Sequence, residues 1–341
     1  MNTTPKSMKR TILIGIRKVL LEKASATKVE LSNKLGISFP TISKFLAEME
    51  RNGEILSVGL DQSNGGRRAK RYSYNPEYML GLALFLEKTE TNYIVFNCVG
   101  EVKEQGILPS VLNDDGLDLL TKCIENTMTK YPKISSIAIG VPGSVDSGQI
   151  FYIPGYERFQ GFDLKGYYEE RFAVPVVVEN DMNAAVLGYH TNRGIKKNES
   201  LIYLYFGQNG PGAGIMINGD IVRGSTFFSG EVSFIPQYND RNFGEAMEID
   251  SSSNNQRIYD ENQIDAITRL VASFVAIINP HTIIFCRDEV ENEVLERVLI
   301  VSSKYIPSKH LPKLTISDWK QDYLFGLQSL GLELLISETS K

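Results

Sequence analysis

Hydrophobic and polar positions alternate with the period of amphipathic helices over the first part of the chain. The first helix is expected to carry one apolar stripe, formed by Ile12, Ile16, Val19 and Leu20. Thr27 and Glu30 have the spacing of a capping box, so they predict the start of a second helix that ends at Gly36. Ser38 is placed to cap a third helix, which we expect to end near Asn52.

The second and third of these helices, joined around a glycine, have the arrangement of a helix-turn-helix. The third is expected to bury one apolar face, formed by Phe39, Ile42, Phe45, Leu46 and Met49. In this motif the N-terminal residues of the second helix enter the major groove of DNA. The outward polar residues are therefore our candidates for DNA contact: Ser38, Thr41, Ser43 and Lys44. Because hydroxyls read bases weakly, we assign the Ser and Thr side chains positioning as well as readout.

Two β-rich runs, 54–60 and 71–74, follow the helices. Asn64-Gly65-Gly66 between them predicts a tight hairpin, because these residues adopt positive φ readily. Four basic residues lie at the tip of this hairpin or just beyond it: Arg67, Arg68, Lys70 and Arg71. A basic hairpin beside a recognition helix is typical of a wing, whose arginines contact phosphates or a narrow minor groove. The alternative is a charged loop that only keeps the chain soluble.

From residue 79 the pattern changes to strands alternating with helices, which predicts an α/β body of two lobes. Strands are expected at Leu80–Leu86, Tyr93–Val99, Ile134–Val141, Val176–Val178, Leu201–Phe206, Ile215–Ile217, Asp220–Val222, Thr282–Cys286 and Leu314–Ile316. Helices are expected at 117–128, 182–189, 263–278, 289–305 and 321–337. Glu179, Asn180 and Asp181 form a polar cluster at the end of one strand, where α/β proteins place ligand sites.

Charge is distributed unevenly along the 341 residues. Residues 1–78 hold 14 Lys and Arg against 7 Asp and Glu, a net charge of +7, whereas residues 79–341 hold 22 against 34, a net charge of −12. This asymmetry indicates an anionic partner for the head only. With 42% hydrophobic and 23% charged residues and no apolar run of about 20 residues, the composition is that of a globular protein without a membrane span, and we expect it in the cytoplasm.

Several segments in order resemble the ROK family of sugar-responsive repressors and sugar kinases, and within it the xylose- and N-acetylglucosamine-type repressors. The segments are the head ending in NGGRRAK, Gly140–Asp146, Glu179–Asn183, Asn218–Gly224 and Ser229–Ser233, the last similar to the family's G-E-x-G-H. The resemblance implies two actin/hexokinase-like α/β lobes preceded by an α+β winged helix-turn-helix domain. We expect the head at 1–78 and the body at 79–341, with lobe one at 79–182 plus a C-terminal helix at 320–341, and lobe two at 183–319.

The resemblance also implies a sugar site. It places sugar hydroxyls on Asn180, Asp181 and Glu231, with Gly143 in the loop beneath the sugar. Carboxylate and amide groups suit this task because they pair with adjacent hydroxyls that both donate and accept hydrogen bonds. In family kinases the Asp is also the general base, so Asp181 would be the base in a kinase. A capping role of Asp181 for a helix beginning at Met182 is compatible with either.

The chain departs from the family pattern at its nucleotide and zinc motifs. The kinase phosphate loop D-x-G-x-T is missing at 82–89, the glycine-rich loop 207–214 is partly preserved, and Arg287-Asp-Glu replaces the Gly-Gly near the adenosine. Phe234 stands at the family's zinc-binding His, and Cys98, Cys123 and Cys286 form no cluster. We therefore expect no enzymatic activity, no cofactor and no metal. A second sugar-binding Glu is not placed, although Glu245 and Glu248 lie in the corresponding segment.

These observations predict a sequence-specific DNA-binding transcriptional regulator, a repressor, with operator DNA and a sugar or sugar derivative as partners. A homodimer or homotetramer is expected, because its two-fold symmetry matches an inverted-repeat operator. One alternative is a ROK sugar kinase that transfers a phosphoryl group from ATP to a hexose and carries a fused DNA-binding head. Others are a body that docks a protein partner on its acidic surface, and a regulator whose sugar site has been lost.

Overall fold

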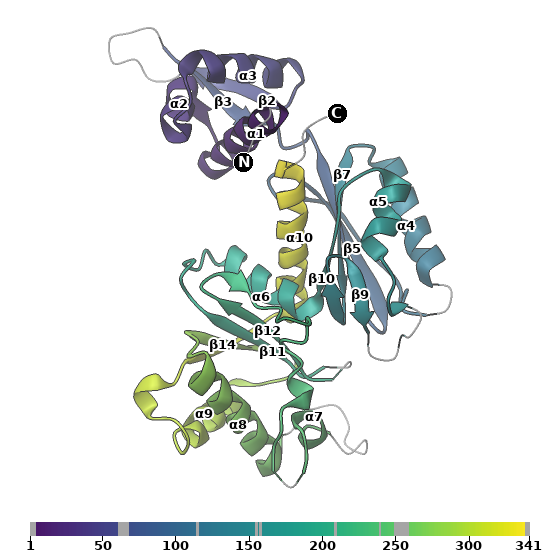
Figure 1. Ribbon diagram of the computed structural model, residues 1–341, viewed down its shortest axis with the longest axis vertical. Coiled ribbons are helices and arrows are strands. Elements are labelled where there is room, and N and C mark those ends of the chain that lie inside the picture. The colour runs from purple at the N-terminus through teal and green to yellow at the C-terminus, as the bar shows by residue number, and fades with distance from the viewer. Residues whose placement is uncertain are drawn as a thin grey trace.

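The computed structural model describes residues 5–60, 68–113, 116–153, 156, 159–207, 210–238, 240–248 and 259–337. The molecule is elongated, with an N-terminal head at one end and two lobes stacked below it (Figure 1). No helix among the described residues has the length and apolar character needed to cross a membrane.

The head contains three helices and a small antiparallel sheet in the order β1-β3-β2. Its elements are α1 (Pro5–Lys23), β1 (Ala26–Thr27), α2 (Lys28–Leu35), α3 (Phe39–Arg51), β2 (Ile55–Leu60) and β3 (Lys70–Tyr74). The predicted capping box is confirmed, because Thr27 and Glu30 exchange side-chain and backbone hydrogen bonds, and Gly36 ends α2 with φ of 64°. The predicted apolar stripe of α1 is buried in the core of the head.

The prediction that Phe39 of α3 lies in the core is wrong. Ile42, Phe45, Leu46 and Met49 are buried, but Phe39 is 49% exposed. Ser38, Phe39 and Pro40 are all exposed, so the first turn of α3 projects beyond the edge of the core that covers the rest of the helix. The apolar spacing of Phe39 therefore does not bring it into the core.

Lobe one is built on a mixed five-stranded sheet in the order β10-β7-β4-β5-β6. Its elements are β4 (Leu80–Leu86), β5 (Glu90–Asn97), β6 (Val102–Pro109), α4 (Gly116–Lys130), β7 (Ile134–Val141), β8 (Ser144–Asp146), β9 (Gln149–Tyr152), α5 (Leu164–Phe172) and β10 (Val176–Asn180). β10, β7 and β4 are parallel, so their carboxyl ends meet at one edge. The short β8–β9 hairpin lies beyond that edge and packs on β10.

Lobe two has a second mixed five-stranded sheet in the order β13-β12-β11-β14-β15. Its elements are α6 (Asp181–Asn192), β11 (Leu201–Tyr205), β12 (Gly212–Ile217), β13 (Asp220–Ile221), η2 (Val232–Phe234), α7 (Phe243–Ala246), α8 (Glu261–Ile277), β14 (Thr282–Cys286), α9 (Asn292–Ser302), η3 (Ser308–His310) and β15 (Lys313–Ser317). The chain then ends in α10 (Trp319–Ser337). Helices α8 and α9 cover the outer face of this sheet (Figure 1).

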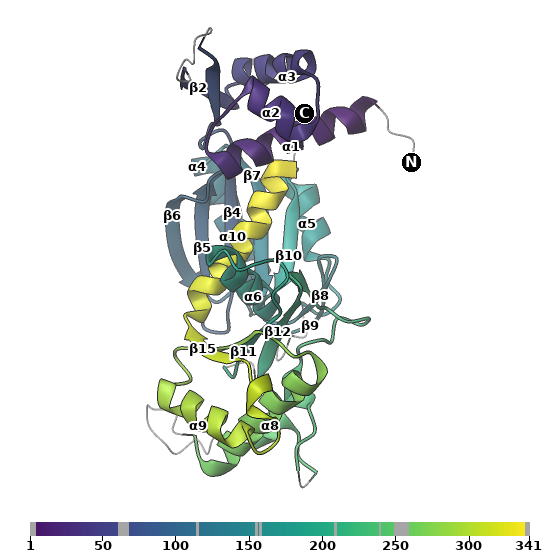
Figure 2. The same cartoon turned by 90° about the vertical axis from the view of Figure 1, so that its left-hand side faces the viewer.

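Helices α6 and α10 cross between the two sheets with their backbones in contact. A Cβ atom at Gly188 would lie 1.8 Å from the Asp322 carbonyl oxygen, and one at Gly326 would lie 1.8 Å from the Ala184 carbonyl oxygen. Only glycine permits this approach, so the crossing point is fixed by sequence. From this crossing α10 runs along lobe one and reaches α1 of the head (Figure 2).

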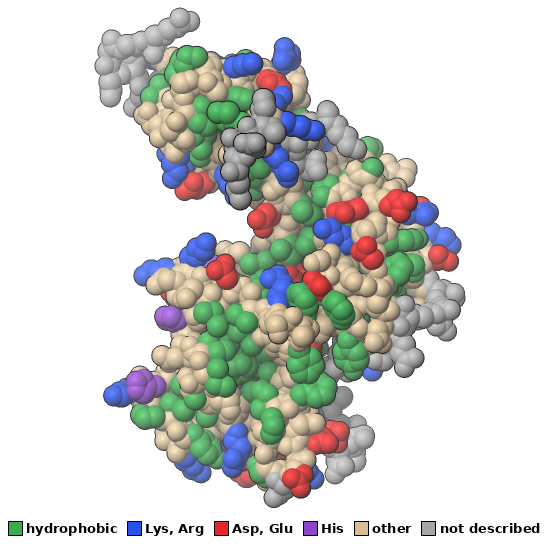
Figure 3. Space-filling view, viewed as in Figure 1, with side chains coloured by type: hydrophobic (Ala, Val, Ile, Leu, Met, Phe, Trp, Pro, Cys, Tyr) green, Lys and Arg blue, Asp and Glu red, His purple; other side chains and the backbone are tan. Residues whose placement is uncertain are grey.

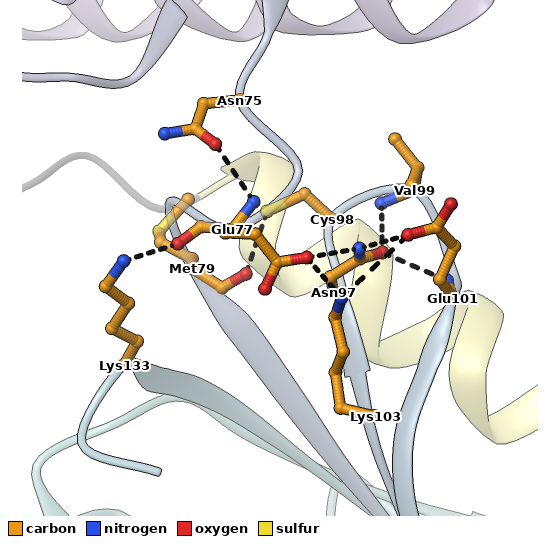
Figure 4. A network of polar contacts seen from close by, with 9 residues as sticks. All are labelled: Asn75, Glu77, Met79, Asn97, Cys98, Val99, Glu101, Lys103 and Lys133. Atoms are coloured by element: carbon orange, nitrogen blue, oxygen red, sulfur yellow. Dashed lines mark hydrogen bonds and ion pairs between the residues drawn. The ribbon is translucent and has the colours of Figure 1, made fainter.

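The head is packed on lobe one through a network of polar contacts around Glu77 (Figure 4). The Glu77 carboxylate accepts hydrogen bonds from Lys103 Nζ at 2.5 Å and from Asn97 Nδ2 at 2.9 Å. Its backbone carbonyl accepts from Lys133 Nζ at 2.7 Å. On the head side, Asn75 Nδ2 donates to the Gly53 carbonyl at 2.8 Å. The joint between head and body is therefore a bonded contact rather than an open linker.

Candidate functional site

A pocket of about 200 Å³ lies between the lobes, at the carboxyl ends of β7 and β10. Both lobes contribute to its lining: Pro142, Gly143, Tyr152, Asn180, Asp181, Met182, Tyr205, Gly210, Pro211, Gly212, Ala213, Ser229, Gly230, Glu231, Ser233 and Phe234. The four residues proposed for sugar contact from the sequence are all among them. Among the described residues, no lysine or arginine lines the pocket.

Asn180 fixes the floor of the pocket. Its Oδ1 accepts from the Asn183 amide at 2.9 Å and so caps α6, and its Nδ2 donates to the Gly143 carbonyl at 2.9 Å. Gly143 in turn lies against β9, where a Cβ atom would come within 2.1 Å of the Tyr152 carbonyl oxygen. The amide of Asn180 keeps one N–H and further acceptor capacity for a ligand.

Asp181 is the first residue of α6, so the expected helix start at Met182 is wrong by one residue and the cap is Asn180. Its Oδ1 accepts from the Met182 amide at 2.8 Å. Burial raises the pKa of Asp181 to about 7, and the nearby carboxylates of Glu231 and Glu87 add to the rise. A carboxylate in this state gains from any ligand that donates hydrogen bonds to it.

Glu231 faces Asp181 from lobe two, in the segment between β13 and η2. Burial raises its pKa, and Ser144 Oγ of lobe one donates to its Oε1 at 3.3 Å. This contact bridges the lobes at the pocket. Asp181 and Glu231 together therefore present two carboxyl groups with raised pKa values, and the described part of the lining offers them no basic partner.

Sequence reasoning missed the ion pair between Glu179 and Arg223. Glu179 is buried at the end of β10 and accepts from Arg223 Nη2 of lobe two. It also accepts from Asn183 Nδ2 at 3.1 Å. The available signal was that Glu179 and Arg223 stand in two of the segments that resemble the family. The pair anchors the segment that carries Glu231 to the strand end that carries Asp181.

A third carboxylate, Glu87, lies behind the pocket where the sequence lacks the kinase phosphate loop. Burial raises its pKa, and the Lys320 ammonium is 3.8 Å from its Oε2. Within the described residues its buried Oε1 has no hydrogen-bond partner, and the same holds for the Tyr323 hydroxyl and Trp319 Nε1 on α10. An acidic side chain at this position is unfavourable for a polyphosphate.

The glycine-rich segment 207–214 is explained in part by packing. Gly212 and Gly214 lie in β12, and a Cβ atom at Gly214 would come within 2.1 Å of the Met182 carbonyl oxygen. At the expected adenosine position, Glu289 is buried and accepts from the Phe206 amide at 2.7 Å. Glu245 caps α7 and does not line the pocket, and Glu248 is exposed. Among the described residues no group of three His, Cys, Asp or Glu is placed to hold a metal ion.

The DNA-contact candidates on α3 divide into two groups. Ser38 and Lys44 are exposed, and the hydroxyls of Ser38 and Thr41 share a hydrogen bond of 2.8 Å at the start of the helix. Ser43 does not fit the outward position expected for it, because its hydroxyl is buried and has no partner within the described part of the chain. Three of the four candidates therefore lie at the surface of α3.

The basic residues of the hairpin differ in their environments. Arg67 lies outside the described residues, and Arg68 is exposed. Lys70 pairs with Glu50 of α3 at 2.5 Å. Arg71 pairs with Glu30 at 3.2 Å and donates to the Ser25 carbonyl at 3.2 Å. Arg71 lies just beyond the hairpin loop, opposite Gly59 of β2, and its contacts hold β3 to the start of α2.

Comparisons with known proteins agree on one family. The sequence profile of the ROK family matches residues 86–244. The xylose repressor of Caldicellulosiruptor bescii is 30% identical over 226 residues, which cover 64% of this chain and 56% of the relative. The β-glucoside kinase of Listeria monocytogenes is 35% identical over 130 residues, which cover 37% of this chain and 42% of the kinase. The matches thus span a little more than half of the xylose repressor and less than half of the kinase.

Among solved structures, the crystal structure of a ROK family transcriptional regulator, a homologue of the E. coli MLC protein, superposes with a TM-score of 0.72. The match covers 96% of this chain and 98% of that one at 18% sequence identity. Identity at this level shows a shared fold. It supports the ROK α/β fold with mixed sheets for this chain.

Proposed function

The chain carries a ROK family domain, and from this premise we propose that it is a transcription repressor whose affinity for DNA is changed by a sugar bound between its lobes. In this proposal residues 1–78 form a winged-helix DNA-binding domain and residues 79–341 form the effector-binding body. The protein acts in the cytoplasm as a homodimer or homotetramer on an inverted-repeat operator. The xylose repressors among its relatives support this assignment.

The head supports DNA binding by its surface and its charge. The start of α3 presents Ser38, Thr41 and Lys44, and Arg68 is exposed at the β2–β3 hairpin. Lys and Arg side chains gather at the outer end of the head (Figure 3). With a net charge of +7 on residues 1–78, this surface attracts phosphates, and the recognition helix supplies the groups that face base edges.

The pocket supports an uncharged, hydroxyl-rich ligand. Asp181 and Glu231 accept hydrogen bonds from hydroxyls, and Asn180 both donates and accepts. A phosphorylated sugar is disfavoured, because the described lining residues include two carboxyl groups and no basic side chain. Binding is expected to strengthen as the pH rises through about 7, where Asp181 becomes ionised and accepts more strongly.

Helix α10 is the observation that carries the proposal, because it links the two sites. At its start Trp319 stacks on the pocket residue Tyr205, with ring centroids 4.4 Å apart. At its end the Ile336 carbonyl accepts from Arg17 Nη1 at 3.1 Å, and the Ser337 carbonyl accepts from Arg10 Nε at 3.3 Å. The 19 residues of α10 span about 28 Å, so one rigid element contacts both the pocket and the head.

A sugar kinase with a fused head is the second candidate, favoured by one observation. A pocket aspartate with a pKa of about 7 is poised to act as general base toward a sugar hydroxyl. Against it, the carboxylates of Glu87 and Glu289 stand at the expected phosphate and adenosine positions. Sugar-dependent ATP hydrolysis or phosphorylation that is lost in Asp181→Asn would establish the kinase.

The test begins with selection of DNA sites from a random pool by the full chain, followed by affinity measurements at several salt concentrations. Replacing Arg67 and Arg68 by Ala is expected to weaken binding and to reduce the slope of log K against log salt by about 2. Lys196→Ala with Lys197→Ala removes two exposed charges from the body and serves as the matched control. No selected site in the wild type, or an unchanged slope in the arginine variant, would contradict the head assignment.

The effector-binding part of the proposal is tested with the DNA site selected in this way. A panel of neutral sugars that includes xylose and glucose is titrated against the protein–DNA complex. One of them is expected to change DNA affinity by a factor of about 5 to 150. Asp181→Ala is expected to keep DNA affinity within about twofold and to lose the response. A normal response in this variant would remove the pocket from the proposal.

A further inference from the structure

Aromatic side chains from both lobes adjoin the pocket. Phe151 of β9 stacks on Phe227 with ring centroids 6.0 Å apart, and Phe228 packs on Phe234 at 5.2 Å. Tyr152, which follows Phe151 in β9, lines the pocket together with Phe234. We call these five residues the aromatic rim. Hydrophobic side chains are visible over the region where the two lobes meet (Figure 3).

These rings are exposed to an unusual degree. The exposed fractions are 43% for Phe151, 47% for Tyr152, 53% for Phe228 and 57% for Phe234. Large apolar side chains grouped on a surface mark a binding site more often than singly scattered ones do. The rim is also continuous with a polar pocket, which distinguishes it from the exposed apolar residues elsewhere in the described chain.

The segment that carries Phe227 and Phe228 is held in a strained conformation. Phe227 has φ of 58°, a region that bulky residues rarely adopt, and the flanking Gly224 and Gly230 also have positive φ. The segment is anchored at one end by the Arg223–Glu179 ion pair and by the Ser229 amide, which donates to the Arg223 carbonyl at 3.3 Å. Such strain persists where the surroundings hold it, and it is concentrated at ligand sites.

The size of the pocket limits what it encloses. About 200 Å³ is below the roughly 300–1,000 Å³ of sites that enclose drug-sized ligands. A ligand with two rings therefore has to place its second ring outside, and Tyr152 and Phe234 direct it onto the rim. Aromatic faces suit the apolar face of a sugar ring or an aryl group, whereas the carboxylates below suit hydroxyls.

We propose that the effector is a glycoside, an inference that rests on the proposed function. Its sugar ring binds Asp181 and Glu231. Its second ring, a sugar or an aryl group, packs on Tyr152, Phe228 and Phe234. The rim acts as a second subsite that sets specificity for glycosides over free monosaccharides. Because Tyr152 belongs to lobe one and Phe228 and Phe234 belong to lobe two, a ring on the rim contacts both sides of the pocket.

The test is titration calorimetry of the full chain with matched probes. Xylose and glucose are compared with their phenyl α- and β-glycosides and with xylobiose and cellobiose. At least one glycoside is expected to bind about tenfold more tightly than its parent sugar. One aromatic ring contact accounts for a difference in affinity of that size. Phe228→Ala and Phe234→Ala are each expected to reduce this advantage to about threefold or less. Phe228 does not line the pocket, so Phe228→Ala is also expected to leave the affinity for the parent sugar within about twofold.

Two further variants keep the result interpretable. Phe234→Trp retains a ring at the mouth and is expected to preserve the glycoside advantage. Phe39→Ala removes an equally exposed phenylalanine from the head and is expected to change neither affinity. Phe228 and Phe234 are exposed, so their replacement leaves the buried core intact.

The outcomes separate the two proposals. Glycosides that bind no more tightly than the parent sugars would overturn the second subsite and leave the sugar-responsive regulator standing. Failure of every probe to bind the wild type would overturn both the subsite and the sugar effector. A change in sedimentation behaviour of Phe228→Ala with an unchanged glycoside advantage would show that the rim is a contact between copies of the chain, and would also overturn the subsite.

Discussion

Buried charge is handled in opposite ways at the head–body joint and at the interlobe pocket. In the head, Arg17 is 1% exposed and pairs with Glu54 at 2.5 Å, and its Nη1 donates to the Ile336 carbonyl of α10. At the pocket, Asp181 and Glu231 are largely buried, and no cation lines the pocket within the part of the chain that the structure describes. The buried charge of Arg17 thus has an opposite charge beside it. The pocket carboxyl groups keep hydrogen-bonding capacity for a ligand.

The difference indicates which region stabilises the fold and which region responds to a ligand. A buried ion pair holds a geometry, since breaking it leaves a charge without a partner. Buried carboxylates without an opposite charge beside them lower stability, and their protonation responds to a bound ligand. We therefore interpret the joint as the part that transmits a movement and the pocket as the part that starts it. α10 contacts both.

The largest expected effect is at the joint. Arg17→Ala leaves Glu54 buried and unpaired, so the free energy of unfolding is expected to fall by about 3–5 kcal/mol in urea titrations. Arg171→Ala is the control, because its pair with Glu125 is exposed and is worth about 0–1 kcal/mol. Equal losses in the two variants would remove the special role of the buried pair.

The pocket is expected to show its unpaired charge in the pH dependence of stability. The folded protein keeps the Asp181 proton up to about pH 7, whereas the unfolded chain loses it near the ordinary value of 3.8. Stability is therefore expected to fall as the pH rises from about 4 to about 7, by at most about 1.4 kcal/mol per pH unit from this group. Asp181→Asn should flatten that part of the curve in unfolding experiments, while Asp146→Asn, at an exposed turn, should not. A curve of unchanged slope would mean that Asp181 is ionised in the folded state.

The link between the two regions is tested by Arg17→Lys. A lysine keeps the charge opposite Glu54, but its single ammonium does not reproduce the fork that also holds Ile336. We expect DNA affinity close to wild type and a loss of most of the coupling of about 1–3 kcal/mol between effector and DNA. Arg171→Lys, with an exposed pair, is the matched control. Full retention of the effector response would place the coupling elsewhere.

The smallest expected effect concerns the face of α3. Ser43→Ala removes a buried hydroxyl without a partner, so stability is expected to rise by about 1 kcal/mol, with DNA affinity unchanged. Thr41→Ala, at the exposed start of the helix, is expected to weaken DNA binding instead. Loss of DNA affinity in the Ser43 variant would restore its predicted outward role.

Local patterns predicted much of the fold. Residue spacing within a single segment was enough to predict the capping box at Thr27, the apolar stripe of α1 and most strands of the two sheets. Strand β6, the β8–β9 hairpin and helix α5 were not predicted, because their apolar residues lack a sustained period. Phe39 and Ser43 were misplaced because periodicity defines a face of a helix but not how far along the helix the core extends.

The site was predicted less completely than the fold. Gly143, Asn180, Asp181 and Glu231 meet at one pocket, as the family resemblance implied. The Arg223–Glu179 pair and the aromatic rim were not foreseen, since they join residues far apart in the sequence whose spacing carries no signal. The ion pairs of Lys70 and Arg71 were missed for the same reason, because their partners belong to other elements.

The central claim is that the pocket and the DNA-binding surface are coupled, and the most direct test is their reciprocity. The effector is titrated into the full chain with and without a saturating selected DNA site, and DNA is titrated with and without saturating effector. By linkage the two ratios of affinities have to be equal. We predict equal ratios of about fivefold or more in wild type. An effector affinity that DNA does not change would contradict the coupling.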